Sequence, residues 1–115
     1  MSEKNWVVYL VRCSDKTLYC GISNDVQRRL KEHNSGKGAK YTRSRRPVEL
    51  IVGSPELPKP DALKLEYRIK KMPADQKISE LNRIRHELTT LRAFKSLRRD
   101  IRALVKIIDK LLKEI

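Results

Sequence analysis

Apolar and β-branched residues are concentrated in three short runs in the first half of the chain. Trp6–Arg12 and Leu18–Ile22 form the first two runs. The polar segment Ser14–Thr17 between them has the composition of a turn, so the pattern predicts a β-hairpin. Val48–Gly53 predicts a third strand, and the prolines of Ser54–Pro60 predict an extended connector after it.

Helical spacing is found between and after these strands. Asn24 with Gln27 three residues later resembles a capping box and predicts a helix start. Val26 and Leu30 mark the apolar side of this helix, which we expect to end within His33–Gly36.

A second helix is predicted after the proline-rich connector. Asp61 is its expected N-cap, and Leu65, Ile69 and Met72 follow at i, i+4 and i+7. Pro73 is expected to end this helix.

Beyond Pro73 the pattern is helical throughout, because no Gly or Pro occurs from Ala74 to Ile115. Apolar residues form two heptad-like stripes that meet out of phase near Thr89–Thr90 and a candidate cap at Ser96. Two structures fit this pattern: a helical hairpin, or one long helix that dimerises. The stripes consist of Leu81, Ile84, Leu88 and Leu91, and of Leu97, Ile101, Leu104, Ile108, Leu111 and Ile115.

Length and charge narrow the classes of protein that fit. With 115 residues the chain is one small domain with an appendage, and its net charge of +13 favours an anionic partner such as nucleic acid or an acidic membrane surface, with solubility as the alternative. The longest apolar stretch, Val7–Val11, is far shorter than the ~20 residues of a membrane-spanning helix. Residues 2–5 do not resemble a signal peptide. We therefore expect a cytoplasmic protein without a membrane partner.

The chain is expected to divide after residue 78. Residues 1–78 hold 17 basic and 9 acidic residues, a net charge of +8, and residues 79–115 hold 10 and 5, a net charge of +5. Positive charge is therefore spread over the predicted domain and the helical tail. Cys13 and Cys20 form no disulfide framework or zinc motif and are expected to be reduced core thiols.

The segment Gly36–Pro47 contains five basic residues, two glycines and no acidic residue. It is predicted to be a mobile or ligand-ordered loop whose cations contact phosphates, and a merely solvated loop is the alternative. Tyr41 is placed to stack on a base or sugar. The candidate nucleic-acid-binding residues are Lys37, Lys40, Tyr41, Arg43, Arg45 and Arg46.

Five positions in order resemble the signature of the GIY-YIG nuclease family. They are Val8-Tyr9-Leu10 and Tyr19-Cys20-Gly21 in the two hairpin strands, followed by Arg29, His33 and Glu66. The resemblance covers about residues 5–78 and is closest to small single-domain bacterial GIY-YIG proteins and to the nuclease domain of the structure-selective endonuclease that cuts branched DNA. It implies an α+β fold with a small three-stranded, mainly antiparallel sheet flanked by helices, here followed by a helical C-terminal tail.

The resemblance also implies chemical roles. Glu66 would hold a single Mg²⁺ or Mn²⁺, since a hard cation accepts one carboxylate together with waters; the alternative is an ordinary helix ion pair with Lys70 at i+4. Arg29 would clamp the scissile phosphate, a task for which its planar guanidinium is suited, whereas the neighbouring Arg28 is expected to be an exposed helix residue.

Tyr9 and Tyr19 would flank the attacking water and the phosphate, with Tyr9 helping to remove the proton of the water. Side chains alternate between the two faces along each strand, so the number of unpaired loop residues decides whether Tyr9 and Tyr19 lie on the same face. They do so only if this number is odd. We therefore predict a loop of three or five residues. His33, four residues after Arg29, would shuttle a proton or hold the phosphate, and a histidine satisfied by backbone carbonyls is the alternative.

Together these features predict a metal-dependent endonuclease that cleaves DNA. The resemblance further implies structure selectivity, a setting in repair or recombination, and 5′-phosphate and 3′-hydroxyl ends. One alternative is a non-catalytic nucleic-acid-binding protein that keeps the fold. Another is an adaptor whose tail, residues 79–115, forms a homodimer or binds a protein partner.

Overall fold

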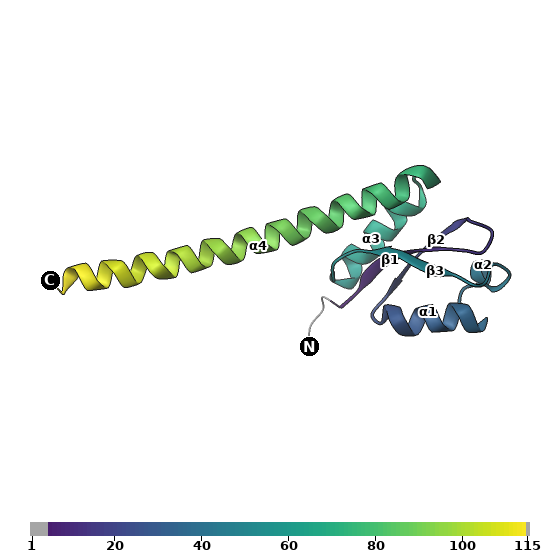
Figure 1. The fold of residues 1–115 in the computed structure, drawn as a ribbon, viewed down its shortest axis with the longest axis horizontal. Coiled ribbons are helices and arrows are strands. Elements are labelled where there is room, and N and C mark those ends of the chain that lie inside the picture. Colours follow the sequence, from purple (N-terminus) through teal and green to yellow (C-terminus); the bar gives the residue numbers. More distant parts are fainter. Residues whose placement is uncertain (1–4, 115) are drawn as a thin grey trace. The chain divides into compact units, whose positions relative to one another are not determined.

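The structure is a computed structural model that describes residues 5–114, so the expectations for residues 2–4 and for Ile115 lie outside the described residues. Strands and short helices make up the first part of the described chain, and one long helix follows (Figure 1). In chain order the elements are β1 (Val7–Arg12), β2 (Leu18–Ser23), α1 (Val26–Ser35), α2 (Lys40–Arg43), β3 (Glu49–Gly53), α3 (Lys59–Lys70) and α4 (Ala74–Lys113).

The three strands form one antiparallel sheet in the order β2-β1-β3, which confirms the predicted α+β fold. Arg12 pairs with Leu18, so the five residues Cys13–Thr17 connect the hairpin strands. The loop is closed by the Cys13 amide, which donates to the Thr17 carbonyl over 2.8 Å. The prediction of a loop of three or five residues is therefore confirmed.

Each face of the sheet builds its own apolar cluster. Helix α1 covers one face and α3 the other (Figure 1). On the α1 side Tyr9, Val11 and Cys13 are buried, and Tyr19 packs against them. The α3 side buries a second set, namely Val8, Leu10, Cys20, Val52, Ala62, Ile69 and Leu81. The alternation along β1 therefore directs Tyr9 to the α1 side and its two neighbours to the α3 side.

Two predicted helix starts are shifted in the structure. Helix α1 is capped by Asp25, whose carboxylate accepts from the Arg28 amide over 3.1 Å, so Asn24 is not the N-cap. Helix α3 starts at Lys59 after Pro58, two residues before Asp61, which lies in the first turn. Proline is tolerated in the first turn because the first amides of a helix have no intrahelical acceptor.

The basic segment contains a short helix, α2, where the sequence predicted a loop. Thr42 in this helix is fully buried. The Ser14 amide also donates to the Arg45 carbonyl over 2.9 Å, which joins the segment to the hairpin loop. The residues joined by these contacts are far apart in the sequence, so no local sequence pattern predicts the helix.

Two compact units make up the chain, Met1–Arg85 and His86–Ile115. The first turns of α4 belong to the first unit, because Leu81 is fully buried in the α3-side cluster and Ile78 packs against it. The core of the first unit therefore extends beyond residue 78.

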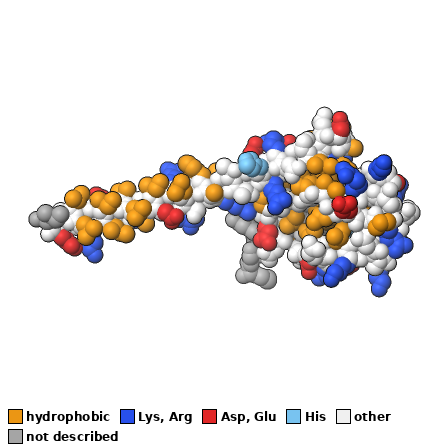
Figure 2. All heavy atoms as spheres, in the orientation of Figure 1, with side chains coloured by type: hydrophobic (Ala, Val, Ile, Leu, Met, Phe, Trp, Pro, Cys, Tyr) orange, Lys and Arg blue, Asp and Glu red, His pale blue; other side chains and the backbone are white. Residues whose placement is uncertain are grey.

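The second unit is helical up to Lys113, and α4 has no break at residues 89–96. Of the two structures that fit the sequence, the described residues contain the single helix and not the hairpin. Apolar side chains follow one another along it (Figure 2), and those from Leu91 to Leu112 that are large and exposed have 47–63% of their surface accessible. Dimerisation or partner binding through these side chains stays a prediction. Within residues 5–114, no helix is both long and apolar enough to span a bilayer.

Leu81→Ala should lower the free energy of unfolding of the full chain by about 2–5 kcal/mol, the usual cost of a leucine-sized cavity. Leu63→Ala on α3 is the matched control, because Leu63 is 46% exposed; its cost should stay below about 1 kcal/mol. Urea unfolding followed by circular dichroism measures both. Equal costs for the two variants would contradict the packing of Leu81 in the core.

Candidate active site

The phenol of Tyr9 lies across the neighbouring strand at Gly21. The two residues are paired in the β1–β2 register. A Cβ atom on Gly21 would lie 2.6 Å from the Tyr9 hydroxyl oxygen and 2.8 Å from its Cζ. Only a residue without a side chain leaves this space, and Gly21 therefore allows the phenol to reach helix α1.

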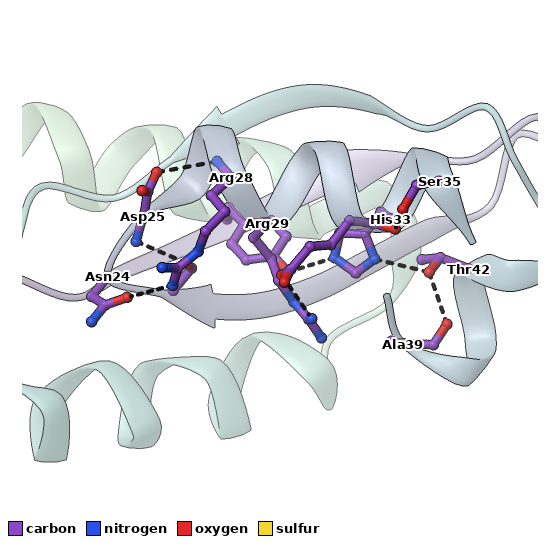
Figure 3. A network of polar contacts seen from close by, with 11 residues as sticks. Asn24, Asp25, Arg28, Arg29, His33, Ser35, Ala39 and Thr42 are labelled. Atoms are coloured by element: carbon purple, nitrogen blue, oxygen red, sulfur yellow. Dashed lines mark hydrogen bonds and ion pairs between the residues drawn. The ribbon is translucent and has the colours of Figure 1, made fainter. Parts of the chain in front are cut away.

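His33 is the residue of helix α1 that contacts the phenol of Tyr9. The Tyr9 hydroxyl oxygen is 2.8 Å from Nε2 of His33, and Nδ1 of His33 is 2.8 Å from Oγ1 of Thr42 in α2. Figure 3 shows the His33 ring bonded to Thr42, and Thr42 bonded onward to Ala39. His33 is fully buried. Its partners are two hydroxyls, so it is not the histidine satisfied by backbone carbonyls that the sequence also allowed.

Arg29 lies one turn before His33 on α1. It forms an ion pair with Glu32 over 3.3 Å, and its side chain is 32% exposed. Burial by itself would lower the pKa of Arg29, but hydrogen bonds with Glu32 and Tyr9 outweigh it and raise the pKa. Arg28 is exposed, as expected. Arg29 is therefore the arginine of this pair that faces the tyrosine.

Burial sets the protonation of the Tyr9–His33 pair. It raises the pKa of Tyr9 to about 12, although the hydrogen bond with Arg29 opposes the rise. Burial, assisted by the positive charge of Arg29, lowers the pKa of His33 below its ordinary value. At neutral pH the pair is a neutral phenol beside a neutral imidazole.

Tyr19 completes the group on the same face of the sheet. Its ring packs edge-on against His33, with 5.4 Å between centroids, and stacks with Tyr41 at 5.9 Å. The guanidinium of Arg45 lies 4.0 Å from the centre of the Tyr41 ring. Tyr41, predicted to stack on a base, thus packs on protein groups and is 37% exposed.

Glu66 lies on α3, which covers the other face of the sheet. Its carboxylate is paired with Nζ of Lys70 over 3.5 Å, and the same ammonium lies 6.0 Å from the Tyr19 ring centre. Because β2 is an edge strand, α3 side chains reach Tyr19 around that edge. Glu66 is connected to the other candidate residues through Lys70 and, within residues 5–114, forms no direct bond with them.

The donor set of this region fits a hydrated magnesium or manganese ion. No cluster of three or more Asp, Glu, His and Cys side chains occurs in the described part of the chain. Mg²⁺ is commonly held by one or two carboxylates, waters and substrate phosphates and does not require a cage of protein ligands. Glu66, with a side chain 19% exposed, would supply the single carboxylate and release Lys70.

The cations of the basic segment fall into two groups. Arg45 is held by Asp15 over 3.0 Å and by the Tyr41 carbonyl, and Arg46 by the carbonyls of Arg43 and Asn34. The second group consists of exposed cations of residues 36–47 whose side chains have no hydrogen-bonded or ionic partner among the described residues: Lys37, Lys40 and Arg43. The second group is available to phosphates.

Some residues of the site were missed by sequence reasoning. Gly21 and Thr42 carry no charge and were given no role, although Gly21 ends the second tripeptide of the family signature and Thr42 lies in the basic segment. Arg12 and Lys16 line a cleft with Tyr41 and were not singled out either. Only the fold reveals what these residues contact.

The chain belongs to the GIY-YIG family, a family of nucleases, because the family model described as "GIY-YIG catalytic domain" matches residues 5–79. Nucleases of this family bind nucleic acid and generally use divalent metal ions. The tail beyond residue 79 lies outside the matched region.

Among known proteins, the chain is 46% identical over 78 residues to a UPF0213 protein of Nitratidesulfovibrio vulgaris, covering 68% of this chain and 71% of that one. It is 51% identical over 70 residues to a UPF0213 protein of Bacillus pumilus, covering 61% and 71%. A solution structure of the UPF0213 protein BH0048 from Bacillus halodurans is 37% identical, covers 75% of this chain and 83% of that one, and has a TM-score of 0.40.

Gly21→Ala should displace the phenol of Tyr9 and break its hydrogen bond with His33, because the new methyl group would lie 2.6 Å from the hydroxyl oxygen. The substitution adds a methyl group to a filled space, so we expect the free energy of unfolding to fall by about 1–3 kcal/mol. The nuclear magnetic resonance signals of the His33 ring should also change, because its bond with Tyr9 is lost. Unchanged His33 signals would contradict the close approach.

Proposed function

We propose that the chain is a divalent-metal-dependent endonuclease that hydrolyses DNA phosphodiester bonds. The observation that carries the proposal is the buried 2.8 Å contact between the Tyr9 hydroxyl and His33, with Arg29 beside it. A neutral imidazole in contact with a phenol can accept a proton, and a guanidinium at the same point can hold a phosphate. This combination serves hydrolysis of an anionic ester.

The raised pKa of Tyr9 shapes the proton path. A free phenolate with a pKa of about 12 is costly at pH 7, by roughly 7 kcal/mol. The path avoids it if Tyr9 passes its own proton to Nε2 of His33 as it receives one from water. The water oxygen forms a bond to phosphorus while the bond to the 3′ oxygen breaks. The departing 3′ oxygen takes a proton from solvent water, and after release of the products His33 returns its extra proton to solvent through Tyr9. The products are 5′-phosphate and 3′-hydroxyl ends.

Glu66 and Arg29 have separate electrostatic tasks in this proposal. Glu66 binds Mg²⁺ or Mn²⁺, which when bound supplies positive charge for the phosphate and the departing oxygen. Arg29 approaches the phosphate from α1 and stabilises the added negative charge of the transition state. Tyr19 packs against His33 and limits the space in which the phosphate can lie.

DNA is the proposed partner, in a branched or otherwise structured form and in a repair or recombination setting. Phosphates contact the cations of residues 36–47, and the available ones are Lys37, Lys40 and Arg43. Arg45 and Arg46 support the loop and line its surface, while Tyr41 borders the site. Such contacts supply affinity without reading sequence.

The second candidate is a nucleic-acid-binding protein without catalysis. One observation favours it: Glu66 already has the ordinary helix partner Lys70, so its carboxylate is not an unpaired charge that needs a cation. The two functions differ in turnover and share the phosphate-binding surface.

Cleavage of branched, flapped and linear DNA with Mg²⁺ or Mn²⁺ tests the enzyme proposal. Arg29→Ala and Glu66→Gln should each lower the rate about 10²–10³-fold, because each removes charge stabilisation of the transition state. Arg28→Ala and Glu49→Gln are exposed controls and should stay within about twofold of the parent rate.

Two results would contradict this proposal. Cleavage that survives both Arg29→Ala and Glu66→Gln would place the chemistry elsewhere. Salt-sensitive DNA binding without cleavage of any substrate would favour the binding protein instead.

Lys37→Ala, Lys40→Ala and Arg43→Ala should weaken DNA binding and reduce its salt dependence. Each lost phosphate contact lowers the slope of log K against log salt by about 0.9. Lys64→Ala makes the same charge change on the exposed surface of α3 and should leave the slope unchanged. Fluorescence anisotropy of labelled DNA at several salt concentrations gives the slopes, and equal slopes for Lys40→Ala and Lys64→Ala would contradict the proposed surface.

A further inference from the structure

His33 has two ring nitrogens with different partners, and hydrogen-bond accounting decides which one carries the proton. At the α2 end, Oγ1 of Thr42 lies 2.9 Å from the Ala39 carbonyl, which can only accept. The single hydroxyl proton of Thr42 is therefore donated to Ala39, and Thr42 accepts from Nδ1 of His33 over 2.8 Å. Figure 3 shows this chain from His33 through Thr42 to Ala39.

The Tyr9 end is compatible with this assignment. A neutral imidazole that carries its hydrogen on Nδ1 has a free electron pair on Nε2. The Tyr9 hydroxyl lies 2.8 Å from Nε2 and can donate its proton to it. The Thr42 end therefore fixes hydrogen on Nδ1, and the phenol is the donor to Nε2.

We propose that Thr42 is a positioning residue that holds His33 in the Nδ1-protonated tautomer, which leaves Nε2 as the acceptor of the Tyr9 proton. Only the catalytic consequence of this role depends on the proposed nuclease function. The tautomer itself is a property of the protein without DNA or metal.

Burial supports the arrangement from both sides of the ring. Thr42 and His33 are each fully buried, so water does not replace the hydroxyl. A Cβ atom on Gly38 would collide with Nδ1 and with the Cα atom of His33, which shows how closely residue 38 approaches the ring. The groups around His33 are Tyr9 and Tyr19 from the sheet, and Arg29 and Glu32 from α1. Nδ1 itself is hydrogen-bonded to Oγ1 of Thr42.

The proton relay depends on this tautomer. With hydrogen on Nε2 the imidazole would donate to Tyr9 and could not take its proton. With hydrogen on Nδ1, proton transfer from Tyr9 gives an imidazolium whose new N–H still faces the phenol oxygen. Its other N–H stays on Thr42. Thr42 therefore touches no substrate and acts through His33.

The test is long-range ¹H–¹⁵N spectroscopy of the full chain labelled in its histidine rings, at pH 8. The chain has 2 histidines, and the variant His86→Gln identifies the signals of His33. The parent protein should show His33 with protonated Nδ1 and unprotonated Nε2. Thr42→Val keeps the shape but removes the acceptor, so the proton should move toward Nε2; Thr42→Ser should restore the parent pattern.

Three outcomes would overturn the role of Thr42: an Nε2-protonated His33 in the parent, unchanged spectra in Thr42→Val, or a Thr42→Ser pattern equal to that of Thr42→Val. Where DNA is cleaved, Thr42→Val should lower the rate at least about tenfold at unchanged DNA affinity, while Thr42→Ser stays near the parent. Absence of cleavage in the parent overturns the nuclease proposal alone, because the spectra need neither DNA nor metal.

Discussion

The hydrogen bond between Tyr9 and His33 connects the centre of the sheet to the helix that covers it, and the arrangement of the candidate site depends on it. The phenol reaches His33 only because Gly21 has no side chain. His33 in turn fixes α2 through Thr42, and thereby orders the segment that carries the cations. A single buried contact thus links strand pairing, helix packing and the surface proposed for phosphate binding.

In the first unit, the positively charged groups are separate from the buried groups that are proposed to move a proton. The first 78 residues carry a net charge of +8, yet the groups proposed to move a proton are neutral and buried. Arg29 lies at the boundary, where its guanidinium is partly exposed and still reaches the phenol. This position lets one arginine meet an anionic ligand in solution and influence the proton path inside.

The sequence allowed the sheet to be predicted because period-two patterns and turn residues are local signals. The odd loop length followed from requiring Tyr9 and Tyr19 on one face, and the structure confirms it. The predicted start of α3 was wrong because prolines 58 and 60 favoured an extended connector, although the first turn of a helix tolerates proline. Helix α2 was missed since four residues have no periodicity and depend on the tertiary bonds of Thr42. The continuity of α4 through residues 89–96 was undecided because out-of-phase stripes do not by themselves require a break.

The five-residue hairpin loop has a consequence for insertions and deletions. Adding or removing one residue within Cys13–Thr17, with the strands re-paired beyond it, would turn Tyr19 toward α3 and Cys20 toward α1. A change of two residues would keep both sides as they are. The loop is exposed at its tip, where length changes are usually harmless. Here the tolerated lengths should therefore differ by even numbers, so the length of an exposed turn restricts which variants keep the buried site.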